Sequence, residues 1–331
     1  MQEPPEIAAT EKKNPPFDGN DTDLTTASGS NSGLDTGFTW LVYGFAFVTV
    51  TVLLWLTWGI LQKALPAIQH FGLGFLWSQE WDVDNLKFGA LPYIYGTLVS
   101  SLTALLLAVP VGLAVALVTS EDFLPSWVRS PIAFIVELIA AIPSVIIGLW
   151  GIFVLSSFLQ PIQEWLHHNL GAIPLFGTQP FKQSMLVACV ILAIMILPTM
   201  AAISRDVLLA LPQDLRSGSM SLGATRWETI FGLLLRAGIP GIVGAAILSL
   251  GRALGETMAV TMVIGNSPQL SISLLDGAST IPSLLVNQFG EAQDDLHIGA
   301  LMYLALILFA LTLLVNIVAV LMVRLIVRQQ G

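Results

Sequence analysis

Residues 241–265 read GIVGAAILSLGRALGETMAVTMVIG, and Arg252 and Glu256 are the only charged residues among them. The stretch is long enough and apolar enough to cross a bilayer as a helix. An ionised side chain at bilayer depth costs about 2.5 to 3.5 kcal/mol on insertion scales, so it persists mainly where it lines a pathway or meets a partner. The two charges therefore make this helix the first candidate for the functional site.

The composition of the whole chain is that of an integral membrane protein. Hydrophobic residues make up 55% of the 331 positions and charged residues 11%, a balance that a water-exposed globule could hardly keep soluble. The sequence predicts an all-α fold with six transmembrane helices. Their apolar runs occupy 38–61, 96–119, 131–159, 184–203, 241–265 and 298–323.

The third predicted helix contains a glutamate, Glu137, and a proline, Pro143. Proline removes one internal hydrogen bond of a helix and clashes with the preceding turn. A bent helix is therefore expected, with its kink at Pro143.

Lysine and arginine in the connections predict that the N- and C-termini are both cytoplasmic. In that orientation nine of these residues lie on the inner side and three on the outer side. The inner ones are Lys12, Lys13, Arg129, Arg205, Arg216, Arg226, Arg236, Arg324 and Arg328, and the outer ones are Lys63, Lys87 and Lys182.

The same patterns divide the chain into four parts. Residues 1–37 hold seven of the 22 acidic residues and few apolar ones, which predicts a disordered cytoplasmic tail. Residues 38–95 would form the first transmembrane helix and a periplasmic loop, and 325–331 a second cytoplasmic tail. Residues 96–324 would form the core, with a long inner loop at 204–240. No metal site is expected in any part.

The inner loop contains the start and stop signals of two short helices. Gly223 suits the left-handed end of the first helix, and Thr225 with Glu228 has the spacing of a capping box that opens the second. Helices of this length are marginal in water, so they must pack against something. A cytoplasmic partner protein and the protein's own helices are both open at this point.

The loop resembles the one that ABC importer permeases present to their ATPase subunit. Residues 217–228 read SGSMSLGATRWE, with Gly223 in register with the glycine of that family. Ser217 stands in place of the family's glutamate, and Arg236 in place of its proline. The resemblance implies that an ATPase-coupling loop is formed by Ser217, Gly218, Ser219, Leu222, Gly223, Ala224, Thr225, Trp227 and Glu228.

Residues 252–260, RALGETMAV, are similar to the corresponding stretch of phosphate ABC importer permeases, the PstC type in particular. Together with shorter matches, the resemblance covers the chain from about residue 88 to its end. It implies a type I importer of inorganic phosphate in the bacterial inner membrane. The implied partners are a second permease of the PstA type, ATPase subunits of the PstB type, an external binding protein of the PstS type and the lipid bilayer, with no nucleic acid.

The chain lacks the G-x-x-x-x-G-K-[ST] phosphate-binding loop, so it is not itself an ATPase of that class. A partner chain would use the ATP, and no cofactor is expected on this chain. Other oxyanions, such as sulfate, molybdate or phosphonate, are alternative substrates. A secondary transporter driven by an ion gradient is an alternative class.

The charges of the fifth predicted helix support two hypotheses. Arg252 and Glu256 are four residues apart, which places them on one face of a continuous helix, with Glu137 as a candidate third member. Gly251 and Gly255 form a small stripe that permits close approach of a second helix. In the first hypothesis Arg252 contacts passing phosphate while the carboxylates keep that contact weak enough for release. In the second the charges only lock helices together.

Overall fold

The computed structural model describes residues 32–121 and 124–330. Most of the predicted acidic tail therefore lies outside the described residues. Its last six positions are helical, because α1 extends over Ser32–Phe71 and begins before the predicted start of the first helix. By its internal contacts the chain divides into two compact units, Met1–Leu56 and Thr57–Gly331.

The described part of the first unit is a segment of α1 with an exposed apolar surface. A helix that is apolar all round is expected where lipid surrounds it. The exposed side chains include Phe38, Trp40, Phe45, Phe47 and Trp55.

Six helical stretches among the described residues are long and apolar enough to cross a membrane, which confirms the predicted number. The all-α fold is confirmed as well, because helices joined by turns make up the described elements. The six stretches are Thr36–Leu76, Leu91–Ser120, Ser144–Leu170, Met185–Ala210, Arg226–Gly255 and Asp295–Arg324.

The third predicted helix is two helices and not one bent helix. α3 covers Ser126–Ala141, and Ile142 and Pro143 are extended, with ψ angles of 128° and 138°. Proline pushes the residue before it away from the helical conformation, so Pro143 ends α3 instead of bending it. After the proline, one helical stretch contains α4 (Ser144–Trp150), a π-helical turn (Gly151–Leu155) and α5 (Ser156–Leu170).

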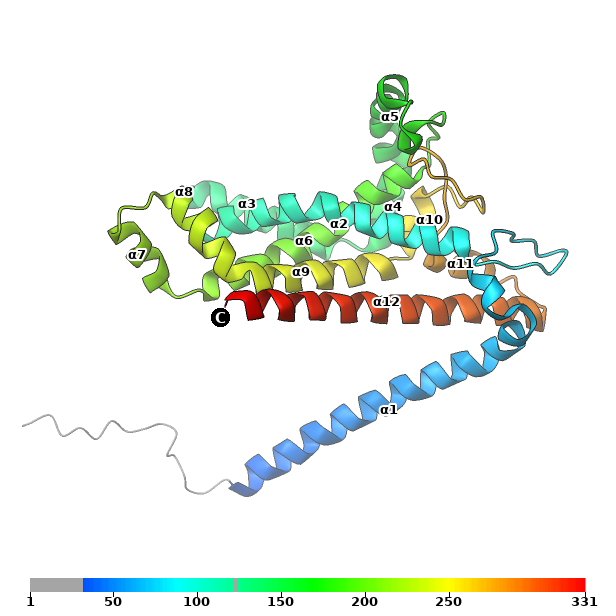
Figure 1. The fold of residues 1–331 in the computed structure, drawn as a ribbon, viewed down its shortest axis with the longest axis horizontal. Helices are drawn as coiled ribbons and strands as arrows, with labels where there is room; N and C mark the ends of the chain where they lie inside the picture. Colours follow the sequence, from blue (N-terminus) through cyan, green and yellow to red (C-terminus); the bar gives the residue numbers. More distant parts are fainter. Residues whose placement is uncertain (1–31, 122–123, 331) are drawn as a thin grey trace, which may run out of the picture. The chain divides into compact units, whose positions relative to one another are not determined.

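α6 is the centre of the second unit. It covers Met185–Ala210 and packs against α2 (Leu91–Ser120) and α9 (Leu235–Gly255), which run beside it in Figure 1. α12 (Asp295–Gln330) packs against α9. Because α6 is enclosed by other helices, its apolar residues are buried on several sides, among them Ile191, Leu192, Ile196 and Met200.

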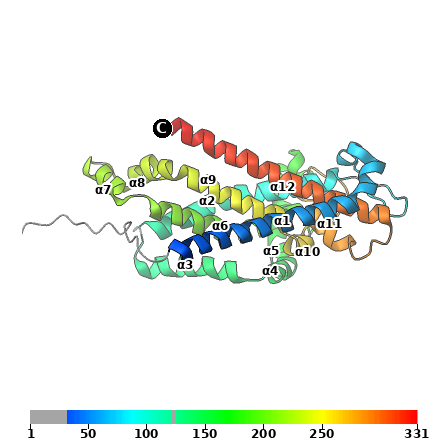
Figure 2. The same ribbon diagram turned by 90° about the horizontal axis from the view of Figure 1, so that it is seen from below.

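Aromatic residues of the connection between α1 and α2 form a second hydrophobic core. Phe75 is buried and stacks on Tyr303 of α12, with ring centroids 4.7 Å apart. Trp81 Nε1 donates a hydrogen bond to Gln288 Oε1 of α11 (Ile281–Gln288) at 2.8 Å. Figure 2 shows α11 and α7 (Gln213–Ser221) at opposite ends of the second unit, so this core closes the end remote from α7.

Short helices connect the long ones in the second unit. They are α7 (Gln213–Ser221), α8 (Arg226–Thr229), α10 (Met258–Val263) and α11 (Ile281–Gln288), with single helical turns at Gly72–Leu76, Pro174–Phe176 and Ile230–Leu234.

Candidate functional site

The fifth predicted helix is interrupted at Glu256. α9 ends at Gly255, Glu256 is extended with φ −69° and ψ 123°, and α10 begins at Met258. The prediction that Arg252 and Glu256 lie on one face of a continuous helix was therefore wrong. No proline marks the break, and the weak helix former Gly255 is the only local signal for it.

Arg252 lies at the exposed surface of the second unit. Its Nη1 donates a hydrogen bond to Thr199 Oγ1 of α6 at 3.1 Å. Among the described residues, no carboxylate oxygen lies within the 4.0 Å limit of an ion pair with its guanidinium. Leu248, one turn earlier on α9, is 60% exposed. This face of α9 is therefore open in the second unit.

Glu256 is half-buried at the break between α9 and α10. Its Oε1 accepts a hydrogen bond from the backbone N–H of Ala259 at 3.4 Å. The first amides of a helix lack internal partners and carry partial positive charge. The carboxylate of Glu256 therefore satisfies one amide that the break leaves open.

Glu137 does not join the other two charges. It is exposed on α3, which packs against α6 and α2. Within the described part of the chain, Glu137 forms no hydrogen bond or ion pair with Arg252 or Glu256. The predicted cluster of three charges is not formed within the second unit.

The small-residue stripe of α9 faces open space. A β-carbon added at Gly251 or Gly255 would meet no atom within 4 Å. The described helices of this chain therefore do not pack closely on the stripe. That a helix of another subunit does so remains a prediction.

The two short helices predicted in the inner loop are present, and we call α7, Gly223 and α8 the α7–α8 corner. Gly223 has φ +91°, a left-handed conformation that glycine adopts without steric cost. The capping box is present as well: the N–H of Thr225 donates to Glu228 Oε2 at 2.8 Å, and the N–H of Glu228 donates to Thr225 Oγ1 at 3.3 Å.

α8 continues without a break into α9, which is the fifth membrane-crossing helix. The combined helix runs from Arg226 through the π-helical turn to Gly255, with Pro240 inside it. The predicted start of the span at residue 241 was therefore wrong. The consequence is that the α7–α8 corner is joined to the helix that carries Arg252 without an intervening loop.

The α7–α8 corner exposes apolar side chains. Leu222 is 91% exposed and Trp227 60%, and the Trp227 ring stacks on Phe231 at a centroid distance of 5.8 Å. Ser219 Oγ lies 3.0 Å from Thr229 Oγ1, which ties α7 to α8. Apolar surface of this kind is typical of a docking site. The other predicted coupling residues lie on α7 and in the turn, namely Ser217, Gly218 and Ala224.

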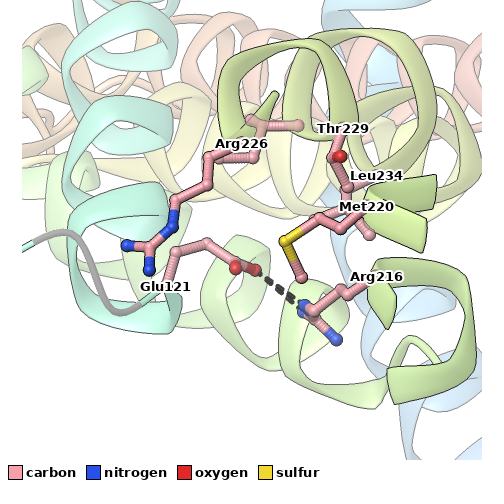
Figure 3. Close-up of a pocket in the computed structure, with 7 residues that line it drawn as sticks. Glu121, Arg216, Met220, Arg226, Thr229 and Leu234 are labelled. Carbon is pink, nitrogen blue, oxygen red and sulfur yellow. Dashed lines mark hydrogen bonds and ion pairs between the residues drawn. The ribbon is translucent and has the colours of Figure 1, made fainter. Parts of the chain in front are cut away.

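An ion pair that the sequence did not predict joins α7 to α2. Arg216 Nη2 donates to Glu121 Oε1 at 2.8 Å, as Figure 3 shows, and the two side chains are 19% and 15% exposed. Ninety-five positions separate these residues, so local patterns could not reveal the contact. The one signal was Glu121 itself, because an acidic residue at the C-terminal end of a helix calls for a nearby cation.

Comparison with known proteins gives the class and then the family. The family model "Binding-protein-dependent transport system inner membrane component" matches residues 108–330. The helical bundle with its exposed α7–α8 corner is accordingly that of a permease subunit. "Phosphate transport system permease protein PstC" of Xylella fastidiosa is 40% identical over 299 residues, which cover 88% of this chain and 90% of the relative. The chain belongs to this PstC family of permeases.

Another relative agrees with this assignment, and solved structures of permeases share the fold. PstC of Mesorhizobium japonicum is 43% identical over 76% of this chain and 79% of its own length. The fold is similar to that of a bacterial alginate ABC transporter, with a TM-score of 0.56, 16% identity and coverage of 88% of this chain and 96% of that one. It is also similar to the MetNI methionine ABC transporter, with a TM-score of 0.51, 20% identity and coverage of 72% and 94%.

Proposed function

We propose that this chain is the permease subunit of an ATP-driven importer of inorganic phosphate in the bacterial inner membrane. Its proposed partners are a PstA-type permease, PstB-type ATPase subunits and a PstS-type binding protein. The names of the PstC relatives support phosphate as the substrate. Since the chain has no nucleotide-binding loop of the G-x-x-x-x-G-K-[ST] type, ATP hydrolysis is assigned to a partner chain.

The observation that carries the proposal is the exposed position of Arg252 beside a break in a membrane helix. Non-helical backbone at membrane depth is tolerated only where protein buries it or where it lines a water-filled cavity. Arg252 stands one turn before the break, on an open face of α9. Facing lipid, its charge would be costly, whereas facing a pathway shared with a second permease it would be hydrated.

The chemistry of Arg252 suits a phosphate ion. Phosphate offers several acceptor oxygens and negative charge, which match the planar donor fork of a guanidinium. Within the described residues Arg252 has a hydroxyl partner, Thr199, and no carboxylate partner, so its charge is available to an anion. This favours the pathway hypothesis over the hypothesis of a helix lock.

Glu256 would set how long the anion stays. Conduction requires that binding be strong enough for entry and weak enough for escape. A carboxylate four positions from Arg252, held on the first turn of α10, repels phosphate as it leaves the guanidinium. Glu137, which lies on another helix, is proposed to face the same pathway only in the complex with the second permease.

Energy would enter through the α7–α8 corner. Its exposed apolar side chains, Leu222 and Trp227, fit a cytoplasmic ATPase subunit as the docking partner. Because α8 continues into α9, a displacement of the corner acts on the same helix that carries Arg252. ATP-driven movement of the ATPases would in this way alternate the access of the helix bundle.

The test is uptake of labelled phosphate by the complex reconstituted in liposomes, with sulfate as competitor. A hydrogen bond to a charged group contributes about 1.5 to 3 kcal/mol, so Arg252→Gln should reduce uptake about 10- to 100-fold. Lys182→Gln, on the second outer connection, is the control for loss of one positive charge. Normal phosphate uptake by the Arg252→Gln complex would refute the pathway role.

The same experiment distinguishes the alternative substrates, the alternative class of transporter and the helix-lock hypothesis. Uptake of sulfate in preference to phosphate would make the chain a permease for another oxyanion. Uptake that an ion gradient drives without ATPase subunits would make it a secondary transporter. A variant with Arg252, Glu256 and Glu137 all replaced by glutamine should assemble and fail to transport, whereas the helix-lock hypothesis predicts that it transports normally.

A further inference from the structure

Arg216 joins the α7–α8 corner to the ends of two long helices. Its Nε and Nη2 donate to Glu121 Oε1 at 3.1 and 2.8 Å, and Glu121 is the residue that ends α2. Its Nη1 donates to the Leu211 carbonyl at 3.1 Å, and Nη2 also donates to the Leu208 carbonyl at 2.8 Å. Both carbonyls lie at the C-terminal end of α6. One side chain of α7 thus bonds to α2 and α6 together.

The geometry of this contact requires a guanidinium. The last carbonyls of a helix have no partner inside the helix, so the end of α6 presents acceptors. A guanidinium carries five N–H donors in a rigid plane and can donate hydrogen bonds to three acceptors that lie in different directions. A lysine ammonium concentrates its donors at one point and could not span the same three acceptors.

The position of Glu121 is explained by Arg216. The C-terminal end of a helix carries partial negative charge, so a carboxylate there is unfavourable unless a cation compensates for it. With 15% and 19% of the side chains exposed, solvent screens the Glu121–Arg216 pair only partly. The pair also lines a pocket of about 200 Å³ together with Met220 and Thr229 of the α7–α8 corner. Figure 3 shows the Glu121–Arg216 pair among the side chains that line this pocket.

We propose that Arg216 is a positioning residue that transmits movement of the α7–α8 corner to the ends of α2 and α6. This inference rests on the proposed function, because it requires an ATPase that moves the corner. With the contact intact, displacement of α7 pulls on two core helices in addition to α9. Without it the corner moves with α9 alone, and ATP hydrolysis is accompanied by less transport.

The test measures phosphate uptake and ATP hydrolysis together in the reconstituted complex. The double variant Arg216→Met with Glu121→Leu removes both charges of the pair, so neither member is left without the other. We expect ATPase subunits to co-purify with it and uptake per ATP hydrolysed to fall about tenfold, within the usual range of coupling between sites. A pair that only stabilises the fold would leave this ratio unchanged, and that result would overturn the proposal.

Single variants keep the proposal testable if the double variant does not assemble. Arg216→Lys keeps the charge and loses the donor fork, so a wild-type ratio of uptake to hydrolysis in this variant would also overturn the proposal. Glu121→Gln keeps the Oε1 acceptor, and we expect its ratio to stay near that of wild type.

Lys87→Met is the matched control for loss of an ion pair. It removes the exposed pair with Glu80, whose charged atoms are 3.3 Å apart, at the other end of the second unit. The ratio of phosphate uptake to ATP hydrolysis should be unchanged in this variant. Absence of phosphate uptake by the wild-type complex would refute the proposed function itself, whereas normal coupling in the Arg216 variants of a transporting complex would refute only the role of Arg216.

Discussion

Arg252 Nη1 donates a hydrogen bond to Thr199 Oγ1 at 3.1 Å, and this bond connects α9 to α6 at the open face of the second unit. The hydroxyl holds the guanidinium in one orientation and leaves its remaining donors available. No carboxylate among the described residues compensates the positive charge of Arg252, as the proposed anion pathway requires. The pair therefore has the properties of a prepared binding group, and its members can be changed one at a time.

Thr199→Val should lower phosphate uptake without unfolding the protein. The two side chains are similar in volume, so the main change is loss of one hydrogen bond of about 1 kcal/mol, which corresponds to roughly a fivefold lower uptake. Thr199→Ser keeps the hydroxyl and should transport nearly as wild type. Initial uptake rates in liposomes measure both variants. Equal rates for the Val and Ser variants would show that the bond does not orient Arg252.

Glu256→Gln separates the charge of this residue from its role at the helix end. Glutamine keeps an acceptor for the N–H of Ala259, so the thermal stability of the complex should stay near that of wild type. Without the negative charge, phosphate should leave Arg252 more slowly. We expect KM and the maximal rate of uptake to fall together.

Uptake measured over a range of phosphate concentrations tests this expectation, and Glu256→Ala is the comparison variant. Alanine removes both the charge and the acceptor, and loss of one hydrogen bond costs about 1 kcal/mol, so the melting temperature should also fall. A raised KM in the Gln variant would contradict the proposed role of Glu256 in release.

The features that the sequence predicted correctly depend on local chemistry. Long apolar runs gave the number of membrane-crossing helices, because a helix satisfies its backbone within one segment. The turn at Gly223 and the cap formed by Thr225 and Glu228 were predictable for the same reason, since their hydrogen bonds join residues three to five positions apart.

The features that the sequence did not predict depend on contacts between distant segments. The break at Glu256 has no proline to mark it, and Arg216 reaches Glu121 across the fold. Glu137 appeared to be a partner for Arg252 because both are charges in apolar runs, yet α3 places it elsewhere. Apolar periodicity predicts which residues are in helices, but it does not predict which helices meet.

Gly223→Val tests whether the left-handed turn is needed for docking of the ATPase. A β-carbon at Gly223 would meet no atom within 4 Å, so the effect must come from backbone strain alone. An ordinary L-residue with positive φ costs about 1 to 2 kcal/mol, whereas asparagine tolerates this conformation. The ATPase should co-purify in smaller amounts with Gly223→Val than with Gly223→Asn. Equal amounts for both variants would show that the turn conformation does not matter for docking.

Gly96 lets the segment before α11 approach α2, and its replacement should destabilise the second unit. A β-carbon there would overlap the carbonyl oxygen of Ser279, next to the hydrogen bond that the N–H of Ile281 donates to Thr97 Oγ1 at 2.9 Å. Overpacking of this kind costs about 1 to 3 kcal/mol, and backbone cannot rotate away as a side chain could.

Gly244→Ala is the matched control, since its β-carbon would meet nothing within 4 Å and the change should stabilise α9 by about 0.5 to 1 kcal/mol. Thermal unfolding of the two variants in detergent should therefore shift in opposite directions, with Gly96→Ala below wild type. If Gly96→Ala melted at the wild-type temperature, the loop at Ser279 would have to move freely away from α2. The end of the second unit remote from α7 would then not be the rigid core that its buried aromatic residues indicate.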